Sequence, residues 1–187
     1  MAVTVKICGI REAEVAEAAV EAGADYLGLV FWPQSSRRIA PREARRIVEA
    51  VPARWVAVFK DANWPEIAEV LQEVPVMGVQ CHGSCPPGWI QAVHGLGLLA
   101  IATHREEQGA DIWLFDGPQA GSGRPWDWQL PRDGRTYWLA GGLTPDNVAD
   151  VVRRLRPDGV DVSSGVERDG RKDPALIARF IEEAKSA

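Results

Sequence analysis

Residues 3–31 read VTVKICGIREAEVAEAAVEAGADYLGLVF, and this stretch decides the fold of the chain. Its two ends, VTVKIC and ADYLGLVF, are apolar runs of strand length. Between them, residues 11–22 place apolar side chains with the spacing of a helix. Strands that alternate with helices are typical of a parallel sheet covered by helices. The stretch therefore predicts one strand–helix–strand unit.

The same alternation continues to the end of the chain. Six further apolar runs of strand length lie at residues 55–60, 76–81, 98–103, 111–116, 136–141 and 159–164. Helical periodicity is found at residues 41–50, 64–73, 85–94, 145–155 and 173–185. We expect Pro41, Pro145 and Pro174 at the first positions of three of these helices, where proline is well tolerated.

Eight strands predict a closed (β/α)8 barrel, the TIM barrel, as a single domain over residues 1–187. An open doubly wound sheet would need a glycine-rich dinucleotide loop after its first strand, where only Gly9 is present. Such barrels typically have about 250 residues, so part of this one must be short. The segment REEQGA, residues 105–110, cannot hold a helix and two turns, which predicts a reduced or missing fifth helix. The sixth helix, around residues 125–131, should also be short.

Composition excludes several classes of partner. The net charge of −5, without long runs of like charge, gives no reason to expect nucleic acid or an anionic membrane. No apolar stretch approaches the about 20 residues that span a bilayer, and no signal-peptide pattern opens the chain. Three cysteines without such a signal argue for reduced thiols rather than a disulfide scaffold. We therefore expect a cytoplasmic protein.

Polar residues that close the strand-like runs should share one end of the barrel, where this fold places its working residues. The candidates are Cys8, Arg37, Arg38, Gln80, His82, Asp116, Gly141, Gly142, Asp161, Ser163, Ser164 and Gly165. Any one of them alone could be a simple cap or turn residue. The segments AGGLTPDN and DVSSGVE, however, follow the seventh and eighth strands, where barrels often bind phosphate. We expect a phosphorylated small-molecule substrate.

Cys8 and Asp116 place a thiol and a carboxyl group at the ends of the first and sixth strands, which suits acid–base chemistry. A cysteine is a poor base at neutral pH unless a nearby positive charge stabilises its thiolate. Lys6 lies on the same strand face as Cys8, because side chains two residues apart point the same way. The residues alone leave open whether Cys8 is a base or a small packing residue.

Cys81, His82 and Cys85 form a second cluster of ligand-type residues in VQCHGSC. A structural zinc site usually needs four ligands, and no matching pair lies elsewhere in the chain, so we expect no metal. Strand alternation predicts that Cys81 points away from Gln80 and His82, toward the helices, as a packing residue.

Several motifs, taken together and in order, carry a resemblance to a known family. VKICGI, GLVFWPQSSRRIAPREA, VQCHG, DGPQAGSGRPWDW, LAGGLTPDN and DVSSGVE resemble phosphoribosylanthranilate isomerase over nearly the whole chain. The resemblance implies a (β/α)8-barrel enzyme of tryptophan biosynthesis. Such an enzyme is an aldose–ketose isomerase that carries out an Amadori rearrangement without a cofactor.

The resemblance also implies roles for individual residues. By motif, Cys8 would be the general base and Asp116 the general acid. The substrate-binding residues would be Arg37 at the anthranilate carboxylate, Gln80 and His82 in the site, and Gly142, Ser164 and Gly165 at the phosphate. The chain departs from the family where QLHG has become QCHG, where residues 124–126 read Arg-Pro-Trp, and where the segment after the fifth strand is shorter.

Two other functions remain open at this point. Lys6 could instead form a Schiff base in an aldolase-like phosphosugar barrel, because desolvated lysines on barrel strands can act as nucleophiles. The chain could also be a phosphosugar-binding barrel without turnover, which would make Cys8 and Asp116 dispensable. Either a monomer or a homodimer is expected.

Overall fold

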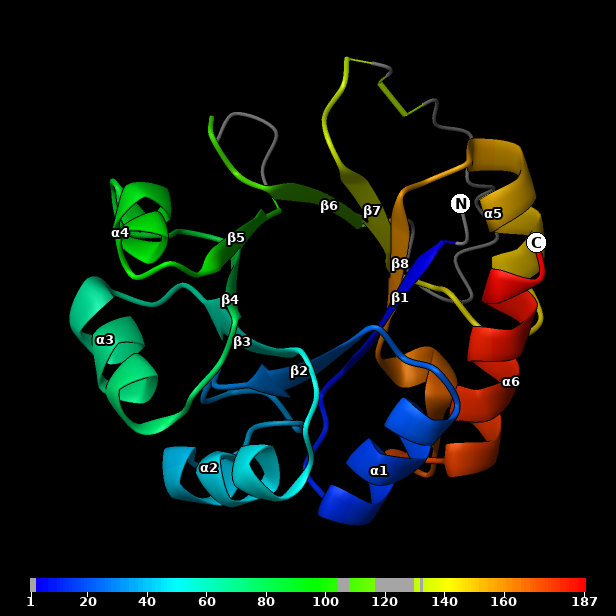
Figure 1. Ribbon diagram of the computed structural model, residues 1–187, viewed down its shortest axis with the longest axis horizontal. Coiled ribbons are helices and arrows are strands. Elements are labelled where there is room, and N and C mark those ends of the chain that lie inside the picture. Colours follow the sequence, from blue (N-terminus) through cyan, green and yellow to red (C-terminus); the bar gives the residue numbers. More distant parts are fainter. Residues whose placement is uncertain (1–2, 104–107, 117–129, 132) are drawn as a thin grey trace.

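The computed structural model describes residues 3–103, 108–116, 130–131 and 133–187. Its centre is a closed parallel barrel in which each strand pairs with the next and the last strand pairs with the first (Figure 1). The barrel strands are β1 (Thr4–Cys8), β2 (Tyr26–Val30), β3 (Trp55–Lys60), β4 (Gly78–His82), β5 (Leu99–Ala102), β6 (Ile112–Asp116), β7 (Tyr137–Ala140) and β8 (Gly159–Val162). The eight predicted strands and the barrel are thus confirmed.

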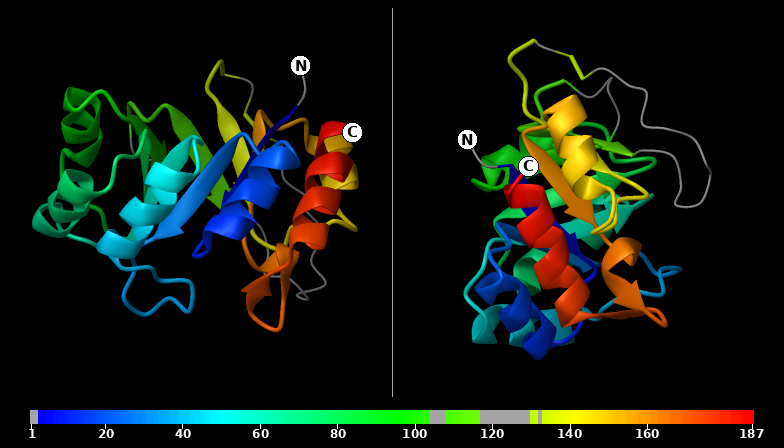
Figure 2. Two further views of the ribbon diagram at one scale, coloured as in Figure 1. Left: turned by 60° about the horizontal axis from the view of Figure 1, so that its bottom comes forward. Right: turned by 90° about the vertical axis from the view of Figure 1, so that its right-hand side faces the viewer.

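Helices surround the barrel on the outside (Figures 1 and 2). They are α1 (Ala13–Glu21), α2 (Pro41–Ala50), α3 (Trp64–Glu73), α4 (Trp89–Gly95), α5 (Val148–Leu155) and α6 (Pro174–Lys185). None of these described helices is long and apolar enough to cross a bilayer. The predicted helical segments are confirmed, with differences of a few residues at their ends.

The helix layer is reduced after β5, as the short connection predicted. Residues 103 and 108–111, the described part of the connection to β6, contain no helix. The expected sixth helix around residues 125–131 lies mostly outside the described residues, as do the glycine-rich segment 121–128 and the Arg-Pro-Trp departure at 124–126.

The start of α5 differs from the prediction. We expected Pro145 at the first helical position, but the helix begins at Val148. The reason is the side chain of Asn147, which accepts a hydrogen bond from the Thr144 amide at 2.8 Å and donates one to the Gly142 carbonyl at 2.8 Å. This side chain stabilises a turn before the helix, because asparagine can replace backbone partners there.

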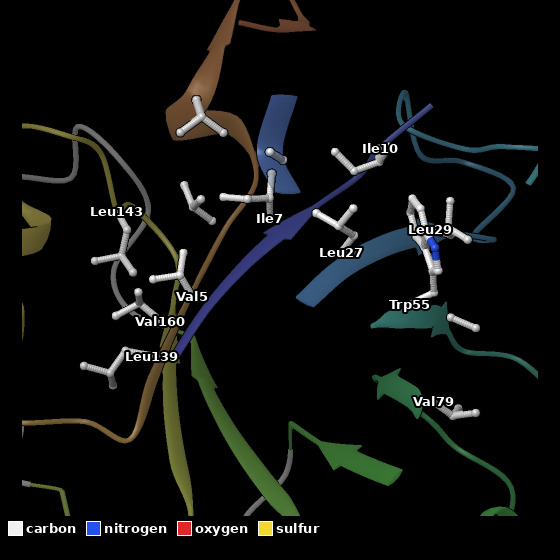
Figure 3. Close-up of a cluster of buried hydrophobic side chains, with 14 of the residues drawn as sticks. Val5, Ile7, Ile10, Leu27, Leu29, Trp55, Val79, Leu139, Leu143 and Val160 are labelled. Atoms are coloured by element: carbon white, nitrogen blue, oxygen red, sulfur yellow. The ribbon is translucent and has the colours of Figure 1, made fainter. Parts of the chain in front are cut away.

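Alternating side chains divide the core into two layers. Val5 and Ile7 of β1 point outward and pack with residues of neighbouring strands and helices, as Figure 3 shows for part of this outer layer. A second cluster fills the barrel interior and consists of Cys8, Val30, Val56, Val58, Ile101, Ile112, Leu114, Trp138 and Ala140. Three polar side chains, Lys6, Gln80 and Asp161, are buried as well.

Trp138 is the largest side chain of the interior cluster, and a glycine on the neighbouring strand makes room for it. Gly159 of β8 lies beside Trp138 of β7 in the ladder. A Cβ atom at Gly159 would be 2.5 Å from two atoms of the Trp138 ring, far inside van der Waals contact. Packing of the barrel interior near the start of β8 therefore depends on a glycine at this position.

We predict that Gly159→Ala lowers the free energy of unfolding by about 1–3 kcal/mol, the usual cost of overpacking a core. Gly95→Ala is the matched control, because a Cβ at Gly95 would have no neighbour within 4 Å. Denaturant unfolding of both variants measures the difference. Equal midpoints would contradict the steric role of Gly159.

A small hairpin after β8 was not predicted. The 3-10 helix η1 (Ser164–Val166) leads into β9 (Glu167–Arg168), which pairs antiparallel with β10 (Arg171–Lys172). The hairpin is the orange element just before α6 in Figure 2. It brings Glu167 and Lys172 to the same end of the barrel as the C-terminal ends of the strands.

Candidate active site

The C-terminal ends of the parallel strands bring most of the predicted site residues to one end of the barrel. Cys8, His82 and Asp116 are the last residues of β1, β4 and β6. Asp161 lies inside β8 and Gln80 inside β4. Each side chain is one inward-facing position deeper in the barrel than the residues at the strand ends. The site therefore has a buried polar floor with more exposed groups above it.

Cys8 and Lys6 lie side by side over a glycine of the neighbouring strand. A Cβ atom at Gly28 of β2 would be 3.0 Å from the Cys8 Sγ and 3.2 Å from the Lys6 Nζ. Lys6 is fully buried, and its Nζ donates a hydrogen bond to the Asp161 Oδ1 at 3.0 Å. Cys8 retains 7% of its accessible surface. The thiol is thus packed next to a buried ion pair.

The charges of this pair act on the thiol in opposite directions. Burial raises the pKa of Cys8 above its ordinary value, Lys6 opposes the shift, and Asp161 adds to it. Burial alone would lower the pKa of Lys6, but Asp161 and Cys8 together outweigh burial through their attraction and hydrogen bonds, so the Lys6 pKa is raised. A charged, paired and fully buried lysine is a poor nucleophile. This geometry disfavours the Schiff-base alternative.

We predict that Lys6→Met moves the alkylation of Cys8 by iodoacetamide to higher pH, because the variant lacks the positive charge that stabilises the thiolate. Cys8 is the only free cysteine, so the modification reports on one site. Mass spectrometry of the product over a pH series gives the midpoint. A midpoint that does not move, in a variant with native circular dichroism, would remove Lys6 from this role.

Gln80, His82 and Asp116 form a chain from the barrel floor to its rim. Gln80 Nε2 lies 2.6 Å from His82 Nε2, and His82 Nδ1 lies 3.8 Å from Asp116 Oδ2. Gln80 is buried, and its Oε1 has no hydrogen-bond partner among the described residues. A buried polar atom without a partner is costly, which makes it a candidate for a ligand contact.

Asp116 is the most exposed member of this chain, with 58% of its side-chain surface accessible. Its remaining burial raises its pKa, Asp161 adds to the increase, and His82 opposes it. Burial lowers the pKa of His82, which favours the neutral imidazole. The environment thus favours a proton on Asp116 more than free solution does, as a general acid requires.

Arg37 is held by a carboxylate that the sequence analysis did not identify. Its Nε and Nη2 donate to the two oxygens of Glu167 at 2.7 and 2.6 Å. Lys172 donates to Glu167 Oε1 at 2.7 Å, and these two cations hold the pKa of Glu167 at about 2 against the effect of burial. The neighbouring Arg38 is exposed, and its backbone pairs with Val30. Of the two adjacent arginines, Arg37 is therefore the one built into the site.

The loops predicted for phosphate have compact backbones. Gly141 and Gly142 have φ values of 77° and 67°, a region that favours glycine. At Gly165 a Cβ atom would overlap the carbonyl oxygen of Leu143, so the loops after β7 and β8 approach closely there. Ser164 begins η1 and is exposed. Exposed amides in such loops are suited to an anionic group.

The expectation of three reduced thiols is wrong for two cysteines. Cys81 is fully buried in the outer core layer, so its predicted direction toward the helices is confirmed. It is joined to Cys85 in a disulfide with a Cα–Cα distance of 6.3 Å. The loop after β4 folds back and brings the two residues within bonding range, which spacing alone did not reveal. Neither sulfur is then free to bind a metal as a thiolate.

Comparisons with known proteins identify the family of this chain. The family model described as N-(5'phosphoribosyl)anthranilate (PRA) isomerase matches residues 5–183. The chain belongs to the PRA isomerase family. An N-(5'-phosphoribosyl)anthranilate isomerase of Streptococcus pneumoniae (strain ATCC BAA-255 / R6) is 41% identical, and the match covers 97% of this chain and 96% of the relative.

Solved structures of PRA isomerases have the same fold. The Thermotoga maritima enzyme is 38% identical with a TM-score of 0.84, and the match covers 99% of this chain and 100% of that one. Another PRA isomerase was solved in complex with reduced 1-(o-carboxyphenylamino)-1-deoxyribulose 5-phosphate. It is 35% identical with a TM-score of 0.82, over 99% of this chain and 100% of that chain. The family that the motifs indicated is confirmed.

Proposed function

We propose that this chain is a PRA isomerase that converts N-(5'-phosphoribosyl)anthranilate to 1-(o-carboxyphenylamino)-1-deoxyribulose 5-phosphate in tryptophan biosynthesis. The observation that supports this reaction most directly is the placement of Cys8 and Asp116 at the ends of β1 and β6, at one end of the barrel. Their ionisable groups provide a base and an acid for an aldose–ketose isomerisation, and no cofactor takes part.

Asp116 performs the first step as general acid. Its proton goes to the ribose ring oxygen while the bond from that oxygen to C1 breaks. The lone pair of the anilino nitrogen forms the C1=N bond of a protonated Schiff base. The raised pKa of Asp116 supports this role, because a carboxyl group must be protonated to act as an acid near neutral pH.

Cys8 performs the second step as general base. Its thiolate removes the proton from C2, and the electrons of that C–H bond form the C1=C2 bond of an enolamine, which neutralises the nitrogen. The enolamine then tautomerises to the ketone, with a proton gained at C1 and one lost from the C2 hydroxyl. Lys6 supports the thiolate, which burial and Asp161 disfavour.

The remaining predicted residues bind the substrate at its two ends. Arg37 binds the anthranilate carboxylate, because a guanidinium pairs well with this group. The backbone at Gly142, Ser164 and Gly165 binds the phosphate. Gln80, whose side-chain oxygen has no partner among the described residues, and His82 contact the sugar between the two ends. We place the enzyme in the cytoplasm, as a monomer or homodimer, and analytical ultracentrifugation distinguishes these two states.

We predict that Cys8→Ser lowers turnover at least about 100-fold, the scale of a lost general base. The decrease in phosphoribosylanthranilate fluorescence measures the rate. Circular dichroism and the affinity for a reduced product analogue show whether the variant keeps its fold and its binding site. Wild-type turnover in Cys8→Ser would refute both the base and the isomerase mechanism.

We predict that Asp116→Asn abolishes most turnover while the affinity for a reduced product analogue changes less than about tenfold, because the acid and the anion anchors are separate. Isothermal titration with the reduced product measures the affinity. Parallel loss of binding and turnover would show that Asp116 anchors the substrate, and Asp161 would be the next carboxylate to test.

A further inference from the structure

We infer that Glu167 is a positioning residue that holds the Arg37 guanidinium with one of its edges turned toward the substrate carboxylate. The inference rests on the proposed role of Arg37. Glu167 would then be a second residue, after Arg37, that determines how well the enzyme recognises a substrate with a carboxylate. Both residues lie outside the barrel strands. Lys172 is the third member of this arrangement.

The contact between Arg37 and Glu167 occupies one edge of the guanidinium. The Nε–H and one Nη2–H point to the two carboxylate oxygens, at 2.7 and 2.6 Å. A guanidinium has five N–H groups in a fixed plane, so three remain, and two of these lie on the edge formed by Nη1 and Nη2. That edge can bind a second carboxylate with two parallel hydrogen bonds. Glu167 thus fixes the plane of Arg37 without using the edge that the substrate needs.

Burial increases from Arg37 to the two residues that hold it, so Glu167 and Lys172 form the buried support and Arg37 is the supported group. The Arg37 side chain is 28% exposed, whereas those of Glu167 and Lys172 are 7% and 5% exposed. Lys172 also donates to the Ser163 carbonyl at 2.9 Å, and the Ser163 Oγ donates to the Cys8 carbonyl at 3.1 Å. The guanidinium is therefore connected to the backbone of the proposed base.

Gly9 restrains the aliphatic part of Arg37. A Cβ atom at Gly9 would lie only 2.7 Å from the Arg37 Cδ, so the arginine stem crosses directly above the backbone that follows Cys8. The Arg37 amide also donates to the Ser35 Oγ at 3.1 Å. Because the aliphatic part and the guanidinium of Arg37 are both held, the side chain has little rotamer freedom to lose when a substrate binds. Such preorganisation increases affinity.

A competing interpretation makes Glu167 an internal competitor that the substrate carboxylate must displace from Arg37. The two interpretations predict opposite effects when the charge of Glu167 is removed. A positioning residue lowers KM for the substrate, so its loss raises KM. A competitor raises KM, so its loss lowers KM.

The test compares two substrates, N-(5-phosphoribosyl)anthranilate and N-(5-phosphoribosyl)aniline, which lacks the carboxylate. We expect Glu167→Gln to raise KM for the first at least about tenfold and to change kcat less than about threefold, since the lost contact is one of binding. For the aniline substrate we expect kcat/KM to change less than about threefold, because no carboxylate needs to be oriented. Steady-state fluorescence kinetics measures both.

Three variants make the result unambiguous. Glu167→Asp keeps the charge with a shorter reach and should fall between wild type and Glu167→Gln; it also serves as the test if the amide variant does not fold. Glu12→Gln breaks the exposed ion pair between Glu12 and Arg171 and should change neither substrate's kinetics. Arg37→Ala should show the same selectivity for the carboxylate as Glu167→Gln, with a larger effect.

Each outcome decides between the interpretations. Equal losses on both substrates would make Glu167 a structural residue, a lower KM would make it a competitor, and unchanged kinetics would remove it from the site; all three overturn the inference. If Arg37→Ala itself shows no selectivity for the carboxylate, the proposed role of Arg37 fails first. Selective loss in Arg37→Ala without selective loss in Glu167→Gln refutes the positioning role alone.

Discussion

The ion pair between Lys6 and Asp161 is the interaction on which the rest of the structure depends. These residues are direct neighbours in the ladder between β1 and β8, where the barrel closes. The pair is buried, so removal of either partner would leave an uncompensated charge, which typically costs about 3–5 kcal/mol. The same two charges set the environment of the Cys8 thiol. Closure of the barrel and the chemistry of the proposed base therefore rely on one contact.

The site separates its functions by depth and by position around the barrel. The charged pair and Gln80 form a buried floor, Cys8 lies just above it, and Asp116 lies at the exposed rim. Arg37 and its supporting carboxylate lie outside the strands, in loops and in the hairpin after β8. The residues proposed for acid–base chemistry thus lie on barrel strands, whereas the residue proposed for the substrate carboxylate lies in a loop.

Much of this arrangement could be predicted from the sequence because each strand and helix carries its own periodicity. Alternation along β1 correctly placed Lys6 and Cys8 on one face of the strand, and the structure has Val5 and Ile7 on the other. The first residue of α5 could not be predicted, because the side chain of Asn147 forms a turn where a proline suggested a helix start. The two-residue strands β9 and β10 are too short to show a period at all.

Contacts between distant parts of the chain could not be predicted from the sequence for a different reason. Arg37 and Glu167 were both visible as charged residues, but nothing in local spacing indicates that they meet. The disulfide of Cys81 and Cys85 likewise depends on how a loop returns to its strand. Family resemblance supplied roles for the residues within motifs, whereas the residues that support them, such as Lys172, became apparent only in three dimensions.

The order in which the site can assemble follows from these long-range contacts. Lys6 pairs with a residue 155 positions later, and Arg37 with one 130 positions later. During synthesis, Lys6 and Arg37 are therefore made long before the residues that compensate their charges. Contacts of such large sequence separation form slowly, because the chain between them loses entropy before they are made. Activity should appear late in refolding, after the helices have formed, as the last step of a cooperative closure.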